Sequence, residues 1–248
     1  KDAFGSDLEA AATHYVNNGR SEGRTDGTKD VSDLNEIIAS ANTATGGTST
    51  VLELSLSATI NSGNETEFNT LLTHEANGQI NITSQNLTVD SGTISAATAN
   101  QLAATTIGTV TAAIDTTATI NGLKTLTGTN AYTIVINSGD ASALASDLTA
   151  IDNATSIAID ASAVTNITGT VSEVQTLYGS SGLSELGNET ININGDITVA
   201  EANAIDLLTT GVVTGFIDQS ERVSSLVTLT PGNAFTIVIA GADATGST

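Results

Sequence analysis

The chain contains no cysteine, methionine or tryptophan among its 248 residues, and only 3% of its residues are aromatic. The absence of cysteine excludes disulfide bonds and thiol chemistry, and it removes a principal ligand of structural zinc. The hydrophobic share of 39% is sufficient for a folded core, and it consists mainly of alanine, valine, isoleucine and leucine. A core must therefore be built from small branched side chains, which suit thin, stacked layers.

Positive charge is also scarce. The chain has six lysines and arginines and 27 aspartates and glutamates, which gives a formal net charge of -21. Four of the six cations lie in residues 1–30, at Lys1, Arg20, Arg24 and Lys29. The other 218 residues hold only two cations and 21 acids. A surface this acidic repels nucleic acid and attracts divalent cations. We therefore expect no nucleic-acid partner.

Long apolar runs are missing as well. No run approaches the roughly 20 residues that a membrane-spanning helix needs. We expect no membrane insertion. Lys1 begins no signal peptide, which favours a mature chain or an excised piece.

The strongest positive feature is an internal repeat of 103 residues. The phrase "AYTIVINSGDA" at residues 131–141 returns as "AFTIVIAGADA" at residues 234–244. Residues 94–141 align on residues 197–244 without a gap, with these identical pairs among others: Ala99/Ala202, Asn100/Asn203, Gly108/Gly211, Ile114/Ile217, Asp115/Asp218, Leu123/Leu226, Leu126/Leu229 and Asn130/Asn233. Such self-similarity indicates a repeat architecture.

A shorter cycle of about 22–34 residues lies inside this unit. Strand-like phrases recur at residues 51–56, 79–83, 110–115, 133–137, 156–160, 190–194, 214–218 and 236–240. Apolar residues at helical spacing lie between them, in the sets Val31/Leu34/Ile38, Leu144/Leu148/Ile151, Val171/Val174/Leu177 and Ala202/Ile205/Leu208. One strand and one short helix per cycle cannot bury an apolar face alone, so each cycle must stack on the next.

These patterns predict an α/β solenoid with two parts. Residues 31–248 are expected to form a right-handed parallel β-solenoid, leucine-rich-repeat-like, with short helices on one side of the strands. Residues 1–30 are expected to form a small N-terminal helical cap or joint. Alternation within the strands predicts a continuous buried stack of isoleucines: Ile134, Ile136, Ile157, Ile159, Ile191 and Ile193.

The last residue of successive strand phrases is usually Asp or Asn, which predicts a column of polar side chains: Asp115, Asn137, Asp160, Asn194 and Asp218. Two interpretations are open. Asp and Asn at a strand end cap the following turn with a side-chain oxygen. Carboxylate and amide oxygens are also suitable ligands for calcium, so the same residues are candidates for weak calcium sites. No other cofactor is expected.

The last strand phrase, Thr236 to Ala240, is expected to expose a strand edge. The helical phrase "ALASDLTAID" follows the earlier copy, but the later copy reaches Thr248 before any counterpart. Thr236, Ile237 and Ile239 are therefore candidate assembly residues, because unpaired strand edges invite pairing. The basic residues Arg20 and Arg24 are the candidate complement on a second copy, because an acidic solenoid end would attract them. The expected partners are further copies of the chain or adjacent repeats of a larger chain.

Motifs that carry catalytic chemistry are weak or missing. His14 and His74 lie in different segments without a neighbouring ligand set. The sequence contains no phosphate-binding loop with its lysine. Nothing in the spacing places a pair of carboxylates in a defined cleft. We expect a protein that is not an enzyme.

Two groups of phrases resemble known families. "AAATHYVNNGRSEGR" is similar to an A-x-H-Y-x-x-x-G-x-x-E-G-R module of large secreted proteins of cyanobacteria and proteobacteria. "ITVAEANAIDLLTTGVV" and "LTGTNAYTIVI" resemble repeats of giant cell-surface proteins of marine cyanobacteria. The resemblance implies an extracellular structural or adhesive role, in a surface layer or in motility, and it supplies no catalytic residues.

The sequence therefore favours a non-catalytic structural module of an extracellular bacterial surface protein, acting as a spacer, layer or filament subunit. One alternative is an adhesin that binds a glycan or another surface through its flat sheet. A third is a polysaccharide-degrading enzyme on a β-helix, although Lys124 and Arg222 do not form the basic cluster that such enzymes use.

Overall fold

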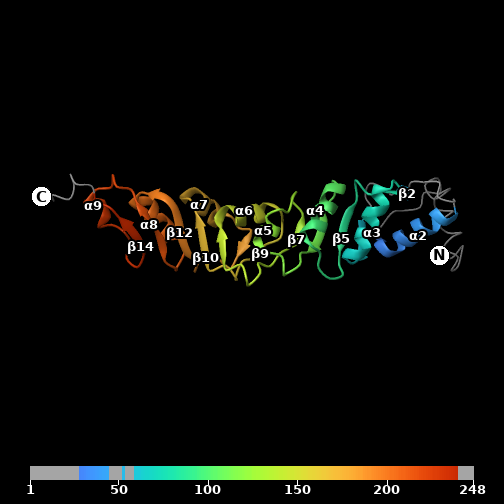
Figure 1. The fold of residues 1–248 in the computed structure, drawn as a ribbon, viewed down its shortest axis with the longest axis horizontal. Helices are drawn as coiled ribbons and strands as arrows, with labels where there is room; N and C mark the ends of the chain where they lie inside the picture. Colours follow the sequence, from blue (N-terminus) through green and yellow to red (C-terminus); the bar gives the residue numbers. More distant parts are fainter. Residues whose placement is uncertain (1–27, 45–51, 54–58, 240–248) are drawn as a thin grey trace. The chain divides into compact units, whose positions relative to one another are not determined.

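The computed structural model describes residues 28–44, 52–53 and 59–239 (Figure 1). The chain divides into two compact units. Among the described residues, the first unit contains everything up to Asp115, together with Thr125–Thr133 and Ala154–Ser156. The second unit contains Thr116–Lys124, Ile134–Asn153 and the chain from Ile157 onward. Both units combine parallel sheets with helices, which confirms the predicted α/β class.

The first unit is built on a five-stranded parallel sheet whose strands follow the order of the sequence. Its strands are β1 (Thr28–Asp30), β3 (Thr59–Gly63), β5 (Asn86–Val89), β6 (Val110–Ala113) and β7 (Ala131–Thr133). The short strands β2 (Leu52–Glu53) and β4 (Ile80–Asn81) form a separate parallel pair. The helices are α2 (Val31–Ala44), α3 (Glu65–Ala76) and α4 (Ala96–Thr105).

The second unit repeats this plan. Its parallel sheet contains β8 (Ser142–Leu144), β10 (Asn166–Gly169), β12 (Thr190–Ile197), β13 (Val213–Ile217) and β14 (Ala234–Ile237), again in sequence order. The short strands β9 (Ile159–Asp160) and β11 (Leu183–Ser184) pair separately. The helices are α5 (Ile120–Leu123), α6 (Ala145–Asn153), α7 (Val171–Gly179), α8 (Val199–Asp206) and α9 (Val223–Leu226). Helices α6, α7 and α8 lie along one side of this sheet (Figure 1).

Local sequence explains where the longer helices begin. Asn64, Thr170 and Thr198 each accept backbone hydrogen bonds at a helix N-terminus. In each case the glutamate three residues later returns a bond to the cap residue's backbone N–H, which completes a capping box. The pattern Asn/Thr-x-x-Glu therefore fixes where a strand gives way to a helix.

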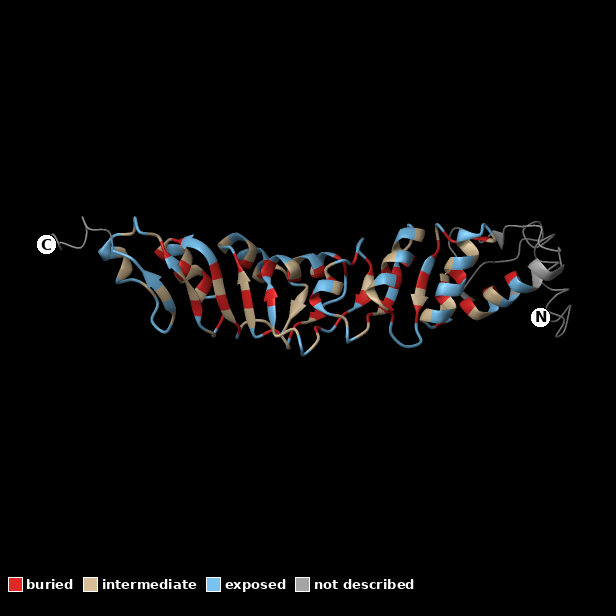
Figure 2. Ribbon diagram, viewed as in Figure 1, coloured by how far each residue is buried: buried red, intermediate tan, exposed pale blue. Residues whose placement is uncertain are grey.

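Buried residues occur on both the strands and the helices of each unit (Figure 2). Five of the six isoleucines predicted for the core are buried: Ile134, Ile136, Ile159, Ile191 and Ile193. The prediction for Ile157 is wrong, because this side chain is 42% exposed. Ile157 lies in a bend, and the extended segment begins only at Ile159, so strand alternation does not reach back to it.

The predicted strand register is also wrong in places. Asp160 lies opposite Val135 rather than Asn137. In β12 a bulge around Gly195, whose φ is +91°, shifts the pairing so that Asp196 lies opposite Phe216. The phrase at residues 190–194 pairs with β10, which the sequence pattern did not identify, and not with residues 156–160. An inserted residue with positive φ cannot be seen in an alternation pattern.

The predicted N-terminal cap lies mostly outside the described residues, as do Arg20 and Arg24. Its last three residues form β1 and pair with β3. The sheet of the first unit therefore already includes Thr28, three residues before the predicted boundary at residue 31.

Candidate functional site

The five residues predicted as a polar column are distributed over both units. Asp115 belongs to the first unit, and Asn137, Asp160, Asn194 and Asp218 belong to the second. Within the described part of the chain, no three His, Cys, Asp or Glu side chains gather as a metal site would require. Calcium binding at these residues remains a prediction.

Three of these side chains cap tight turns. The Oδ1 atoms of Asn137, Asp160 and Asp218 accept the backbone N–H two residues later, at 2.7, 3.0 and 2.7 Å. This is the Asx turn expected for the capping interpretation. The Nδ2 atom of Asn137 also donates to the carbonyl of Thr116, at 2.8 Å. This bond joins two successive cycles of the chain in the second unit, and we call each such cycle a rung.

The same hydrogen bonds favour the ionised form of the two aspartates. The hydroxyl and the backbone N–H of Ser162 lower the pKa of Asp160. The backbone N–H and the hydroxyl of Ser220 lower the pKa of Asp218. Both carboxylates therefore carry their charge at neutral pH, where they could also attract a cation.

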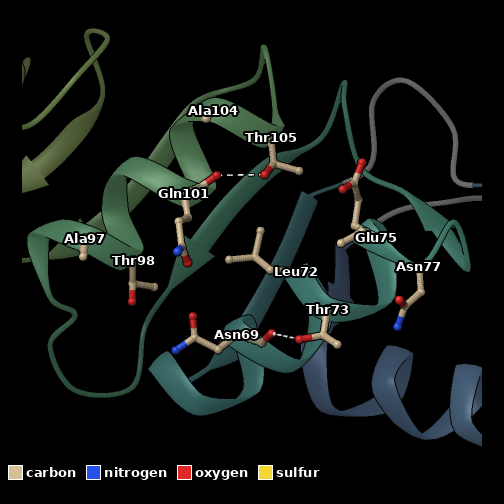
Figure 3. Close-up of a pocket in the computed structure, with 11 residues that line it drawn as sticks. Asn69, Leu72, Thr73, Glu75, Asn77, Ala97, Thr98, Gln101, Ala104 and Thr105 are labelled. Carbon is tan, nitrogen blue, oxygen red and sulfur yellow. Dashed lines mark hydrogen bonds between the residues drawn. The ribbon is translucent and has the colours of Figure 1, made fainter.

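A shallow groove of about 800 Å³ lies between α3 and α4 in the first unit (Figure 3). Its walls are formed by Asn69, Leu72, Thr73, Glu75, Ala76, Asn77, Ala97, Thr98, Gln101, Ala104 and Thr105. The hydroxyls of Thr73 and Thr105 donate to helix carbonyls four residues earlier. Glu75 is the one charged residue of this lining, so the groove offers no paired acid and base, no nucleophile with a base, and no aromatic surface for a sugar.

Glu65 links the first turns of α3 and α4. Its Oε1 accepts hydrogen bonds from the Ser95 backbone N–H at 3.0 Å, the Ser95 hydroxyl at 2.8 Å and the Thr98 hydroxyl at 2.6 Å. Burial opposes ionisation of this carboxyl, but the three hydrogen bonds outweigh burial and lower its pKa. Glu65 therefore acts as a charged clamp at the N-terminus of α4, where negative charge is favourable.

Glu189 is a fully buried carboxylate in the second unit. It accepts the Gly187 N–H, at 2.8 Å to Oε2, and the Tyr178 hydroxyl, at 2.5 Å. Burial and the neighbouring Glu189 raise the pKa of Tyr178 well above its ordinary value. This pair closes a loop between α7 and β12, so the carboxylate has a structural role. The sequence analysis did not identify this pair, because Glu189 is one of 27 acids and only the fold brings it to Tyr178.

One polar contact between neighbouring rungs occurs twice, 103 residues apart. Thr106 and Thr209 are both buried, and their hydroxyls donate to the carbonyls of Gln85 and Glu189, at 2.6 and 2.7 Å. Each hydroxyl also accepts the backbone N–H of the glycine two residues later, at 2.9 Å. A Cβ on Gly108 or Gly211 would overlap the backbone of the preceding rung. The repeated glycines are therefore required by close backbone approach.

Two asparagines of each copy make the same contacts. The Nδ2 of Asn100 donates to Thr125 O at 2.8 Å, and its Oδ1 accepts the Thr127 N–H at 2.9 Å. Asn203 bonds Thr228 and Thr230 in the same way, both at 2.9 Å. Asn130 and Asn233 likewise accept the backbone N–H groups of Val110 and Val213, at 3.0 and 2.7 Å. We call the threonine, glycine and asparagine contacts of each copy the polar clasp: Thr106, Gly108, Asn100 and Asn130, with their counterparts Thr209, Gly211, Asn203 and Asn233.

Comparison with known proteins assigns this chain to no family. Neither a protein-family model, nor a curated protein, nor a solved structure matches this chain. None of the described helices is long and apolar enough to cross a membrane.

Proposed function

We propose that this chain is a non-catalytic structural module of an extracellular bacterial surface protein. Its two units are proposed to be parts of one right-handed parallel solenoid that serves as a spacer, layer or filament subunit. It grows by stacking repeats and by head-to-tail assembly of copies. The observation that carries this proposal is the polar clasp. Its side chains connect each rung to the next by hydrogen bonds, and the same hydrogen bonds recur 103 residues later.

The distribution of polar groups supports a structural role over a catalytic one. The buried or half-buried carboxylates Glu65 and Glu189 bind backbone N–H groups and hydroxyls of their own unit. The described groove between α3 and α4 has one carboxylate and no basic partner. A catalytic site would instead present an unused acid, base or nucleophile to a cleft.

An adhesin is the alternative that one observation favours. Phe216 is 56% exposed on β13, and an aromatic ring on a flat sheet is a common contact for a sugar or an apolar surface. Glycan-array binding of the intact chain would favour this alternative if the Phe216→Ala variant lost it.

The proposed location can be tested on cells of the source organism. Antibodies raised against the purified chain are applied to intact and to permeabilised cells, and electron microscopy locates the bound label. We expect label on intact cells, in a continuous coat or along filaments. Label that appears only after permeabilisation would contradict an extracellular role.

A further inference from the structure

Three Asn–Gly pairs lie in the described part of the chain: Asn77–Gly78, Asn121–Gly122 and Asn194–Gly195. A fourth, Asn18–Gly19, lies outside it. An asparagine followed by glycine can lose its side-chain amide, because the backbone nitrogen of the next residue attacks the side-chain carbonyl carbon. Glycine permits this attack best, since it has no Cβ to crowd the nitrogen or to restrict the backbone. What holds each glycine nitrogen therefore decides which pair can react.

Two of the pairs are held by hydrogen bonds at helices. The Gly78 N–H donates to Glu75 O at 2.8 Å, at the C-terminal end of α3. The Gly122 N–H donates to Thr119 O at 2.9 Å, within α5. A bonded nitrogen keeps its proton and its direction, so it can attack only after the local structure opens.

The third pair, Asn194–Gly195, lies in the bulge of β12 and belongs to neither neighbouring ladder. Pairing with β10 ends at Ile193, and pairing with β13 passes from Asn192 directly to Asp196. Both residues of the pair are exposed. A bulge of this kind leaves its extra residues outside the regular hydrogen bonding of the sheet.

The surroundings of this pair leave room for the reaction. The Asn194 side chain has no hydrogen-bond partner among the described residues. Gly195 has a φ of +91° and open space where a Cβ would stand. The amide group is therefore free to turn toward the next nitrogen, and an attack within one chain is fast once the two atoms can meet.

We propose that Asn194 is a site of spontaneous deamidation through a cyclic succinimide. The Gly195 nitrogen loses its proton to solvent and forms a bond to Asn194 Cγ. The bond between Cγ and Nδ2 then breaks, and ammonia leaves with a proton taken from water.

Water then opens the ring at one of its two carbonyls. Opening at the main-chain carbonyl of residue 194 gives isoaspartate, in which the chain runs through Cγ. Opening at Cγ restores the main chain and gives aspartate. The net reaction consumes one water and releases one ammonia, so it needs no reactant besides the solvent.

The product changes the charge of the second unit. A neutral amide becomes a carboxylate two residues before Asp196, and Asp196 lies opposite Phe216 on β13. Phe216 is the exposed aromatic residue on which the adhesin alternative rests. Deamidation therefore adds negative charge near this residue as the protein ages, whatever the location of the chain.

Site-resolved mass spectrometry tests the proposal. The purified chain is incubated at neutral pH, folded and in parallel in concentrated urea, and samples are digested with pepsin in acid, where the attacking nitrogen keeps its proton. In the folded chain we expect Asn194 to deamidate at least about tenfold faster than Asn77 or Asn121, because only the latter two pairs must first break a hydrogen bond. In urea the three rates should become similar, because the fold no longer distinguishes the pairs.

Fragmentation by electron transfer identifies isoaspartate, which only ring opening can supply. The matched control is Asn194→Gln, because glutamine forms the corresponding larger ring far more slowly. Its peptides around residue 194 should stay unmodified, although Asn188 and Asn192 remain in them. Equal rates at the three pairs in the folded chain, or a product without isoaspartate, would overturn the proposal.

Discussion

The Thr155 side chain takes the place of a neighbouring strand for Tyr132. Its hydroxyl accepts the Tyr132 N–H at 3.0 Å and donates to the Tyr132 carbonyl at 2.7 Å, and both residues are buried. A hydroxyl that bonds both backbone groups of one residue leaves neither group unsatisfied. Contacts of this kind allow short strands to stack although each rung is only a few residues wide.

Replacement of Thr155 by valine should therefore destabilise the chain by about 1–3 kcal/mol, because two buried backbone groups lose their partner while side-chain shape is retained. Urea denaturation measures the change. Thr93→Val is the matched control, because Thr93 is exposed, and it should change the free energy of unfolding by less than about 0.5 kcal/mol. Equal effects of the two substitutions would contradict the role of Thr155.

The two isoleucines around Ala158 give a second matched pair. Ile159→Ala should cost about 2–5 kcal/mol, because its side chain is fully buried and its removal leaves a cavity. Ile157→Ala should cost less than about 0.5 kcal/mol, because Ile157 is 42% exposed. A reversed order in the unfolding free energies would show that the register of this segment is wrong.

The lowered pKa of Glu65 leads to a prediction of how the free energy of unfolding depends on pH. Its pKa in the folded chain lies below the ordinary value of 4.5, so its contribution is present above that value and is lost as the pH falls through the folded pKa. Unfolding free energies between pH 7 and pH 3 should fall less steeply for Glu65→Gln than for the unmodified chain.

The control for this experiment is Glu36→Gln, which removes an exposed carboxylate from α2. It should change the free energy of unfolding at pH 7 by less than about 0.5 kcal/mol, because this side chain is exposed. A Glu65→Gln variant with the full acid dependence would show that hydrogen bonding to Ser95 and Thr98 does not favour the charged form.

Calcium binding by the turn aspartates is tested by melting. If calcium binds the folded chain, its stability rises with concentration by mass action, by about 2.7 kcal/mol at one hundred times the dissociation constant. Melting temperatures are compared in calcium and in chelator at matched ionic strength, for the unmodified chain and for Asp160→Asn with Asp218→Asn. Equal melting temperatures in calcium and in chelator would show that these residues cap turns and do not bind calcium.

The sequence predicted the repeat and most of the core because these depend on local patterns. The offset of 103 residues identifies Asn100, Asn130 and Gly108 as positions that recur in the later copy. Helix spacing identified α2, α6, α7 and α8, although Leu144 precedes its helix and is exposed.

The remaining features depend on long-range contacts. Strands β5, β8 and β10 are only three or four residues long, which is too short for a local pattern to identify them, and they are fixed by pairing with their neighbours. The bulge at Gly195 and the bend at Ile157 shift the register by amounts that no local pattern encodes. Glu65 and Glu189 could not be singled out among 27 acids, because their partners lie in loops and helix ends that only the fold brings together.

The central claim is that the chain is one stack of repeats, and small-angle X-ray scattering tests it most directly. A second copy of residues 94–196 is inserted after Asp196, so that the 103-residue register is preserved. A stack should gain about 20 Å in maximum dimension, from four or five further strands at about 4.8 Å each, while its cross-section stays constant. A larger cross-section with an unchanged maximum dimension would contradict the account.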